Sequence, residues 1–323
     1  MGTYRLIGMN SAVGHGDGSL QVHTNFHLGQ VYYSLGAYRQ AIDILRQNVA
    51  MLQGELRSER YGVAGLLSVT SRTFLVWSLA ELGAFPEGKV LATEGLRLAE
   101  VADEPFSLIS ADMTIGALTL RQGEAATAIP VLERALSRCH TWQNRFLLPQ
   151  AASLLAVAYA RCGRLDESRS LWEQGMEQAV AQGQRPRQAL WGVWLGEAQL
   201  LAGCLEEVQQ LAQCALTLSQ VHQERGNQAY ALRLLGESAA RRDPPGVESA
   251  ASYYHQALAL AEELGMRPLQ AHCHRGLGTL YVATGQRAQA HTELATAIEM
   301  YQSMVMTFWL PETEAALAQV EGR

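Results

Sequence analysis

Apolar residues recur every three or four positions along most of the chain, which is the spacing of an amphipathic α-helix. The segment QAASLLAVAYARCG, residues 150–163, shows this spacing and ends in a glycine. Glycine at that place supplies the left-handed backbone conformation with which many helices end. A second helical segment, RLDESRSLWEQGMEQAVAQG, follows at residues 164–183. The pattern therefore predicts pairs of helices joined by short turns, and it predicts no strands.

The helix pair recurs seven times along the chain at a nearly constant interval. The residue at the turn is Gly36, Gly83, Gly123, Gly163, Gly203, Asp243 and Gly285 in successive units, and four of the six steps are 40 residues long. A large apolar residue stands eight positions before the turn and is followed by Gly or Ala in most units. Small residues at such places allow two helices to cross closely, because a larger side chain would push their axes apart.

The repeated phrase resembles the tetratricopeptide repeat. Two copies, LGQVYYSLGAYRQA at 28–41 and LGTLYVATGQRAQA at 277–290, share the Leu-Gly-x-x-Tyr pattern, the turn glycine and a small residue five positions later. The step of 40 residues exceeds the usual tetratricopeptide period of about 34, and HEAT-type repeats are nearer 40 but lack this phrase. The resemblance implies an all-α fold: a tetratricopeptide-like α-solenoid of about seven helical hairpins.

The domain boundaries follow from where the periodicity starts and stops. We expect residues 1–18 to form a flexible leader, because they are rich in glycine and poorly periodic, and residues 19–323 to form the repeat domain. The expected units are 20–58, 66–105, 106–145, 146–185, 186–225, 226–267 and 268–306, followed by a C-terminal capping helix at 310–321. Pro311 suits the first turn of that helix. The N-terminal end shows no such cap, so we expect a further segment upstream.

Composition and charge narrow the classes of function. The chain is 48% hydrophobic, which provides for a large core, and its net charge of −6 comes without a basic tract, which argues against a nucleic-acid partner. No apolar run approaches the roughly 18 residues that cross a bilayer, and no signal peptide is apparent. The five cysteines are scattered, as is common in a reducing compartment. We therefore expect a cytoplasmic protein with no membrane partner.

The sequence lacks the usual motifs of catalysis and of cofactor binding. It contains no G-x-x-x-x-G-K-[ST] phosphate loop. His272 and His274 stand two positions apart on an expected helix, so they point to different sides and cannot hold one ion together. Trp191 and Trp194 share a helix face, which fits either packing within a hairpin or a surface for a partner. We predict a chain that is not an enzyme and has no catalytic, metal or cofactor residue.

In tetratricopeptide arrays the first helix of each hairpin lines the concave wall, and this rule gives the candidate binding surface. The positions expected to be exposed there are Gln30, Tyr33, Trp77, Glu81, Met113, Arg121, Arg161, Glu197, Arg233, Glu237, Arg241, Arg275 and Thr279. Arg121, Arg161 and Arg241 share one offset in their units and would form a partial column. Such arginines either hold a carboxylate or phosphate ligand or pair with neighbouring acids such as Glu197 and Glu237.

A second resemblance is to a bacterial group of adenylate/guanylate cyclase-like proteins, in which a cyclase domain and an AAA or signalling NTPase domain precede tetratricopeptide repeats. It is carried by GEAQLLAGCLEEVQQLAQCAL at 196–216 and by the DPP insertion at 243–245 followed by LGMRPLQAHCH at 264–274. The resemblance implies a scaffold or sensor arm that binds a protein or peptide and regulates a signalling ATPase or cyclase in the same or a neighbouring chain. Two alternatives remain open: the sensor domain of a transcription activator, and an enzyme with a pocket in the concavity.

Overall fold

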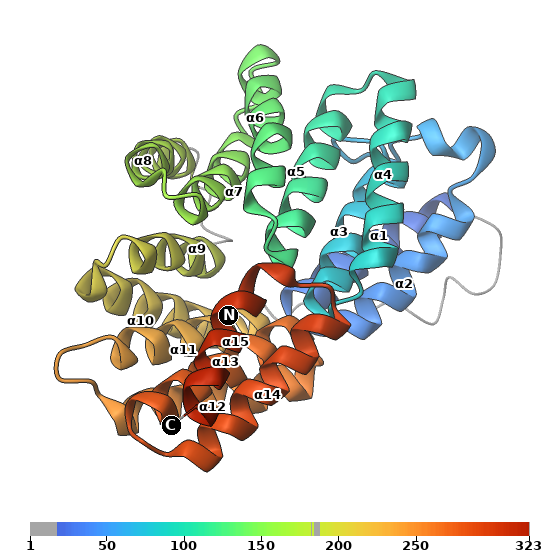
Figure 1. Cartoon of the computed structure of the whole chain (residues 1–323). Coiled ribbons are helices and arrows are strands. Elements are labelled where there is room, and N and C mark those ends of the chain that lie inside the picture. The colour runs from blue at the N-terminus through green and yellow to red at the C-terminus, as the bar shows by residue number, and fades with distance from the viewer. Residues whose placement is uncertain (1–17, 182, 184–187, 323) are drawn as a thin grey trace.

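The computed structural model describes residues 18–181, 183 and 188–322 and is helical throughout this part (Figure 1). Fifteen α-helices and two short 3-10 helices account for the regular structure of the described residues, and no strand lies among them. The all-α prediction is confirmed. The expected leader at 1–18 lies outside the described residues except for Gly18, which begins the first helix.

The helices pair into seven hairpins in chain order. The pairs are α1 (Gly18–Ser34) with α2 (Tyr38–Met51), α3 (Leu67–Glu81) with α4 (Phe85–Ala102), α5 (Pro105–Gln122) with α6 (Ala125–Thr141), α7 (Leu148–Arg161) with α8 (Leu165–Ala181), α9 (Gln188–Leu201) with α10 (Leu205–His222), α11 (Arg225–Ala240) with α12 (Val247–Leu264), and α13 (Arg267–Ala283) with α14 (Arg287–Ser303). The 3-10 helix η1 (Gly54–Ser58) follows the first hairpin, and η2 (Thr307–Trp309) precedes the last helix, α15 (Leu310–Glu321).

The turn glycines have the backbone conformation that the sequence predicts. Those of the first five hairpins and of the seventh have φ between 75° and 98°, a region that residues with a Cβ rarely adopt. Each one ends the first helix of its hairpin and lets the second helix turn back within three residues. The repeat period is therefore set by a glycine-dependent turn.

The small residues within the first helices mark close helix crossings, as predicted. A Cβ added to Gly116 in α5 would lie 2.3 Å from Leu132 Cδ2 in α6. In the seventh hairpin, a Cβ on Gly278 would lie 2.6 Å from Leu294 Cγ. Both leucines are fully buried, so at these crossings a leucine of the second helix fills the space that a side chain on the first helix would need.

The solenoid curves so tightly that its last hairpins lie beside its first ones (Figure 1). The hydroxyl of Tyr230 in α11 donates a hydrogen bond of 2.5 Å to Glu81 Oε2 in α3, although the two residues are 149 positions apart. The side-chain amide of Gln122, at the end of α5, donates to the backbone oxygen of Val305 at 3.0 Å. These contacts join the second hairpin to the sixth, and the third hairpin to the turn after α14.

The helix α15 caps the array, as the sequence predicts. It packs against α14, and Pro311 stands in its first turn. Just before α15, the Trp309 ring stacks on Tyr301 of α14 with 5.7 Å between ring centroids. Trp309 also lies against the turn after α5, since a Cβ on Gly123 would be 2.7 Å from its ring. The capping segment therefore seals the seventh hairpin and contacts the third.

Among the described residues, no helix is both long and apolar enough to cross a membrane.

Candidate ligand-binding cavity

A partly enclosed cavity of about 210 Å³ lies on the concave side of the array. Its walls are the first helices of five successive hairpins, α1, α3, α5, α7 and α9, together with the beginnings of α2 and α11. Sites for drug-sized ligands usually measure about 300–1,000 Å³. A cavity of this smaller size fits one or two amino-acid side chains, and it does not fit a whole peptide.

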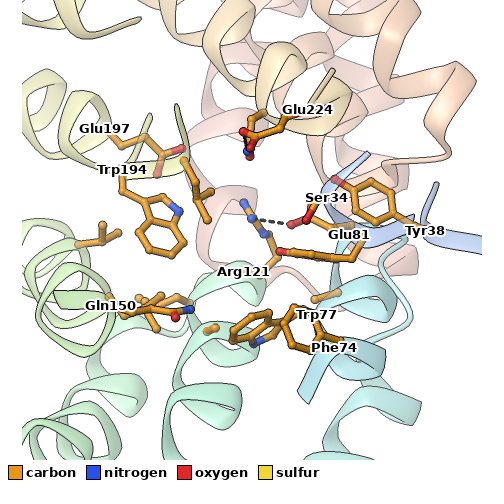
Figure 2. Close-up of a pocket in the computed structure, with 18 of the residues that line it drawn as sticks. Ser34, Tyr38, Phe74, Trp77, Glu81, Arg121, Gln150, Trp194, Glu197 and Glu224 are labelled. Atoms are coloured by element: carbon orange, nitrogen blue, oxygen red, sulfur yellow. Dashed lines mark hydrogen bonds and ion pairs between the residues drawn. The ribbon is translucent and has the colours of Figure 1, made fainter. Parts of the chain in front are cut away.

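Aromatic rings line two sides of the cavity (Figure 2). Tyr33, Phe74 and Trp77 form one cluster, in which the ring centroids of Phe74 and Trp77 are 5.2 Å apart and those of Tyr33 and Trp77 are 5.9 Å apart. Trp194 of α9 stands across the cavity from Trp77 and Phe74. Trp191, one turn earlier in α9, is buried against α8. The packing interpretation holds for Trp191, and the partner-surface interpretation stays a prediction for Trp194, which lines the cavity.

Arg121 projects into the cavity and is paired with Glu81 (Figure 2). Its Nη2 donates to Glu81 Oε1 at 2.7 Å, while Tyr230 donates to the other carboxylate oxygen. The guanidinium carbon also lies 4.5 Å from the centre of the Tyr230 ring, which is a cation–π contact. Burial opposes the charge of Arg121, but Glu81 outweighs it and raises the pKa of the guanidinium above its ordinary value.

A chain of ion pairs continues from the cavity into the sixth hairpin. Glu197 lines the cavity and accepts hydrogen bonds from Arg161 of α7 at 3.2 Å and from Arg233 of α11. Arg233 also donates to Glu237, and Glu237 lies 3.5 Å from Arg241. Burial disfavours the charged form of Glu197, yet Arg233 and Arg161 overcome this effect and lower the pKa of its carboxyl group. Each carboxylate of this chain therefore has an arginine partner without a ligand.

Two arginines of the expected column also bind backbone oxygens. Arg161 Nη1 donates to the carbonyl oxygen of Leu120 at 2.6 Å, and Arg241 Nη1 donates to that of Leu200 at 3.3 Å. Each carbonyl belongs to the end of the first helix in the preceding hairpin, 41 residues earlier, where helical carbonyls lack partners within the helix. The regular spacing of these arginines thus has a structural cause, and the structure shows the pairing with neighbouring acids.

Glu224 differs from the other charged residues around the cavity. It stands at the start of α11, and its Oε2 accepts a hydrogen bond of 2.9 Å from Asn227, which also lines the cavity. Within the described part of the chain it is the one charged lining residue that forms no ion pair. Figure 2 shows it across the cavity from Trp77, with Arg121 and Glu81 between them.

The structure brings part of the expected surface together. Of the predicted residues, Tyr33, Trp77, Glu81, Arg121, Arg161 and Glu197 line the cavity. The other predicted residues that remain accessible lie elsewhere: Gln30 bonds His27 on α1, Arg275 pairs with Glu312 of the cap at 2.9 Å, and Thr279 is exposed on α13. Arg241 is half-exposed beyond the end of the ion-pair chain.

The expectation that Trp77, Glu81, Met113, Arg233 and Glu237 are exposed is wrong, although Trp77 and Glu81 line the cavity. Met113 is only 1% exposed, because α5 is covered by α3 and α7 as well as by its own partner α6. Arg233 and Glu237 are buried because they neutralise each other inside the chain of ion pairs.

Sequence reasoning missed Phe74, Gln150 and Glu224 as residues of the cavity. Phe74 and Gln150 lie in first helices of their hairpins, and the rule for concave positions pointed to other offsets. Glu224 lies in the turn before its helix, where the helical pattern carries no information. Its place at the cavity follows from the return of the sixth hairpin to the first.

The two histidines of the HCH sequence serve packing within the seventh hairpin. His272 Nδ1 is 2.7 Å from the Tyr301 hydroxyl, and His274 Nδ1 is 2.6 Å from Glu293 Oε2. Cys273 between them is fully buried. The described residues contain no group of three or more side chains placed to hold a metal ion.

Comparison with known proteins identifies the fold. No family model matches the sequence, and no curated protein matches it. Among solved structures, a Rap protein complexed with competence and sporulation factor is similar with a TM-score of 0.58 and 17% identity, over 77% of this chain and 66% of that one. NprR in complex with its cognate peptide NprX has a TM-score of 0.58 and 12% identity, over 95% and 90%. Apo RapI has a TM-score of 0.57 and 13% identity, over 78% and 86%.

These identities are low, so the likeness shows the fold alone. The chain is a tetratricopeptide-like helical solenoid.

Proposed function

We propose that this chain is a regulatory scaffold that binds a protein or peptide, and that the central cavity anchors a side chain of the bound partner. The observation that carries this proposal is the cavity, which five successive hairpins build and which aromatic rings line on two sides. Aromatic pockets of this kind hold the anchoring residues of protein interfaces, because a rigid ring supplies contact area at a small entropic cost. The similar Rap and NprR structures are complexes with a signalling factor and a peptide, respectively.

The lining chemistry favours binding over catalysis. Among the described residues that line the cavity there is one serine, Ser34, and no histidine or cysteine to activate it or to act in its place. Arg233 and Arg161 lower the pKa of Glu197 against the effect of burial, so its carboxyl group holds no proton for general acid catalysis near neutral pH. This arrangement supports the proposal of a non-enzymatic role.

The resemblance to repeats that follow signalling ATPase and cyclase domains supports a more specific proposal. In this view the scaffold is a sensor arm, and the bound partner changes the activity of an NTPase or cyclase domain in the same or a neighbouring chain. The contact between the second and sixth hairpins supplies a route, because a ligand that displaces the cavity wall also shifts the Glu81–Tyr230 contact.

The proposal is tested with a random heptapeptide library displayed on phage. Selected peptides are synthesised with a fluorophore, and their affinity is measured by fluorescence anisotropy for the wild type, Trp194→Leu and Trp142→Leu. We expect Trp194→Leu to weaken binding at least about tenfold, the loss typical of an aromatic anchor. Trp142 lies outside the cavity, so Trp142→Leu should bind normally. A library that yields no binder, or binders indifferent to Trp194→Leu, contradicts the proposal.

A further inference from the structure

The lining of the cavity carries more negative than positive charge. Glu81, Glu197 and Glu224 contribute three carboxylates, Arg121 and Arg161 contribute two guanidinium groups, and Arg233 behind the lining is a further partner of Glu197. An anionic ligand would meet the three carboxylates. It would also have to displace a carboxylate from an arginine that already has a protein partner.

Glu224 is the lining carboxylate with no ion-pair partner among the described residues. Glu81 is held by Arg121 and Tyr230, and Glu197 by Arg161 and Arg233, so both oxygens of each carboxylate are in use. The Oε2 atom of Glu224 accepts only the neutral amide of Asn227. Its Oε1 atom accepts no hydrogen bond from the described residues, so it is available to a donor on a ligand.

The aromatic rings of the cavity suit the same kind of ligand. The faces of tryptophan and tyrosine rings attract cations, with an energy that grows as water is excluded. The structure already contains this interaction beside the cavity, where the Arg121 guanidinium lies 4.5 Å from the centre of the Tyr230 ring. Trp194 is partly buried against three apolar clusters, so its ring is held in position at the cavity wall.

We propose that the cavity binds an organic cation, the guanidinium or ammonium group of a basic side chain, on the side lined by Trp194 and Glu224, with the cation in contact with Glu224. This inference rests on the proposed function, since it names the side chain by which a peptide partner is anchored. The space of about 210 Å³ admits one arginine or lysine side chain with its remaining water. The cation supplies Glu224 with the ion-pair partner that the described residues do not provide.

The test compares positively charged probes with a neutral one. N-acetyl-arginine amide, its neutral isostere N-acetyl-citrulline amide, agmatine, and the capped pentapeptide Gly-Gly-Arg-Gly-Gly are titrated into the full chain, with tryptophan fluorescence as the readout. Probes this small reach affinities in the millimolar range, so titrations extend to about 10 mM. The variants are Glu224→Gln, the exposed control Glu206→Gln in α10, and the pair Trp194→Leu and Trp194→Phe.

We expect the arginine probes to bind at least about tenfold more tightly than the citrulline probe, because the guanidinium adds ionic and cation–π attraction to the hydrogen bonds that both probes can donate to Glu224. Glu224→Gln and Trp194→Leu should remove this preference. Glu206→Gln and Trp194→Phe, which retain the charge and the aromatic ring of the cavity, should keep it. Circular dichroism establishes that each variant is folded, and the Phe and Leu variants of Trp194 remain informative should Glu224→Gln not fold.

Equal binding of arginine and citrulline probes would overturn the inference, as would preference for N-acetyl-aspartate amide. If heptapeptides are bound through Trp194 but no basic probe or residue is preferred, the cation site is refuted and the proposed function stands. If agmatine binds through Glu224 but no peptide is bound, the cation site stands as a site for a small molecule and the peptide function is refuted. A gain in affinity from agmatine to the pentapeptide supports a peptide as the source of the cation.

Discussion

The substitution Gly226→Ala tests whether the sixth hairpin closes on the first. Gly226 stands near the start of α11, and a Cβ there would lie 1.9 Å from the hydroxyl oxygen of Tyr38, at the start of α2. Tyr38 is only 5% exposed and its ring contacts Tyr33, so it has little room to move away. Overpacking of this kind costs about 1–3 kcal/mol. The higher helix propensity of alanine returns at most about 1 kcal/mol.

The matched control is Gly95→Ala in α4. The nearest atom to its added Cβ is 3.7 Å away, an ordinary contact, so this change should stabilise the protein by about 0.5–1 kcal/mol through helix propensity. The two alanines therefore act with opposite sign. Tyr38→Phe removes the clashing oxygen and leaves the nearest atom at 3.1 Å, so the Gly226→Ala change should cost less in that background.

The assay is urea unfolding followed by circular dichroism. Because a repeat array can unfold in stages, amide hydrogen exchange at the starts of α2 and α11 should locate the loss. A Gly226→Ala protein as stable as the wild type, with unchanged exchange at both helices, would show that the hairpins do not make this contact in solution.

Three further predictions concern buried groups. Glu197→Gln removes a carboxylate from Arg161 and Arg233 and should lower the free energy of unfolding by about 3 kcal/mol in urea titrations. The exposed Glu206→Gln should change it by less than about 0.5 kcal/mol. Equal effects of the two changes would contradict the ion-pair chain. Gly196→Leu should destabilise by about 3 kcal/mol or more, because even a Cβ there lies 2.3 Å from Leu234, and an unchanged urea midpoint would contradict close packing. Burial holds the pKa of His272 well below its ordinary value of 6.5, so below that pH the unfolded chain binds a proton that the folded chain does not. The free energy of unfolding should therefore fall by up to about 1.4 kcal/mol per pH unit as the pH drops below 6.5. His272→Gln should weaken the pH dependence of the urea midpoint measured between pH 5 and 8.

The repeat architecture can be predicted from the sequence because each hairpin is built from local contacts. The turn glycines and the small residues at the crossings recur at fixed offsets, and the structure gives each of them the backbone or packing role that its offset predicts. The pairing of Arg161 with an acid was one of two alternatives that the residues allowed, and geometry was needed to show it, while the binding of a ligand by these arginines stays a prediction.

The cavity depends on the curvature of the whole array, which a repeat pattern does not encode. Small rotations between successive hairpins add up, and only their sum brings Tyr230 to Glu81 across 149 positions. Glu224 reaches the cavity by the same return of the chain, and no periodic position marks it. The prediction that Met113 is exposed is wrong for a related reason, because neighbouring hairpins cover a position that a single hairpin would expose.

The claim that the concave cavity is the ligand site is tested most directly by ¹⁹F NMR of the chain with its six tryptophans replaced by 5-fluorotryptophan. Each resonance is assigned by a single substitution, and the tightest peptide from the library is then titrated in. The signals of Trp77 and Trp194, which line the cavity, should shift at saturation, while that of the exposed Trp142 should stay in place. A shift at Trp142 with no change at Trp77 and Trp194 would contradict the account and place the binding surface outside the cavity.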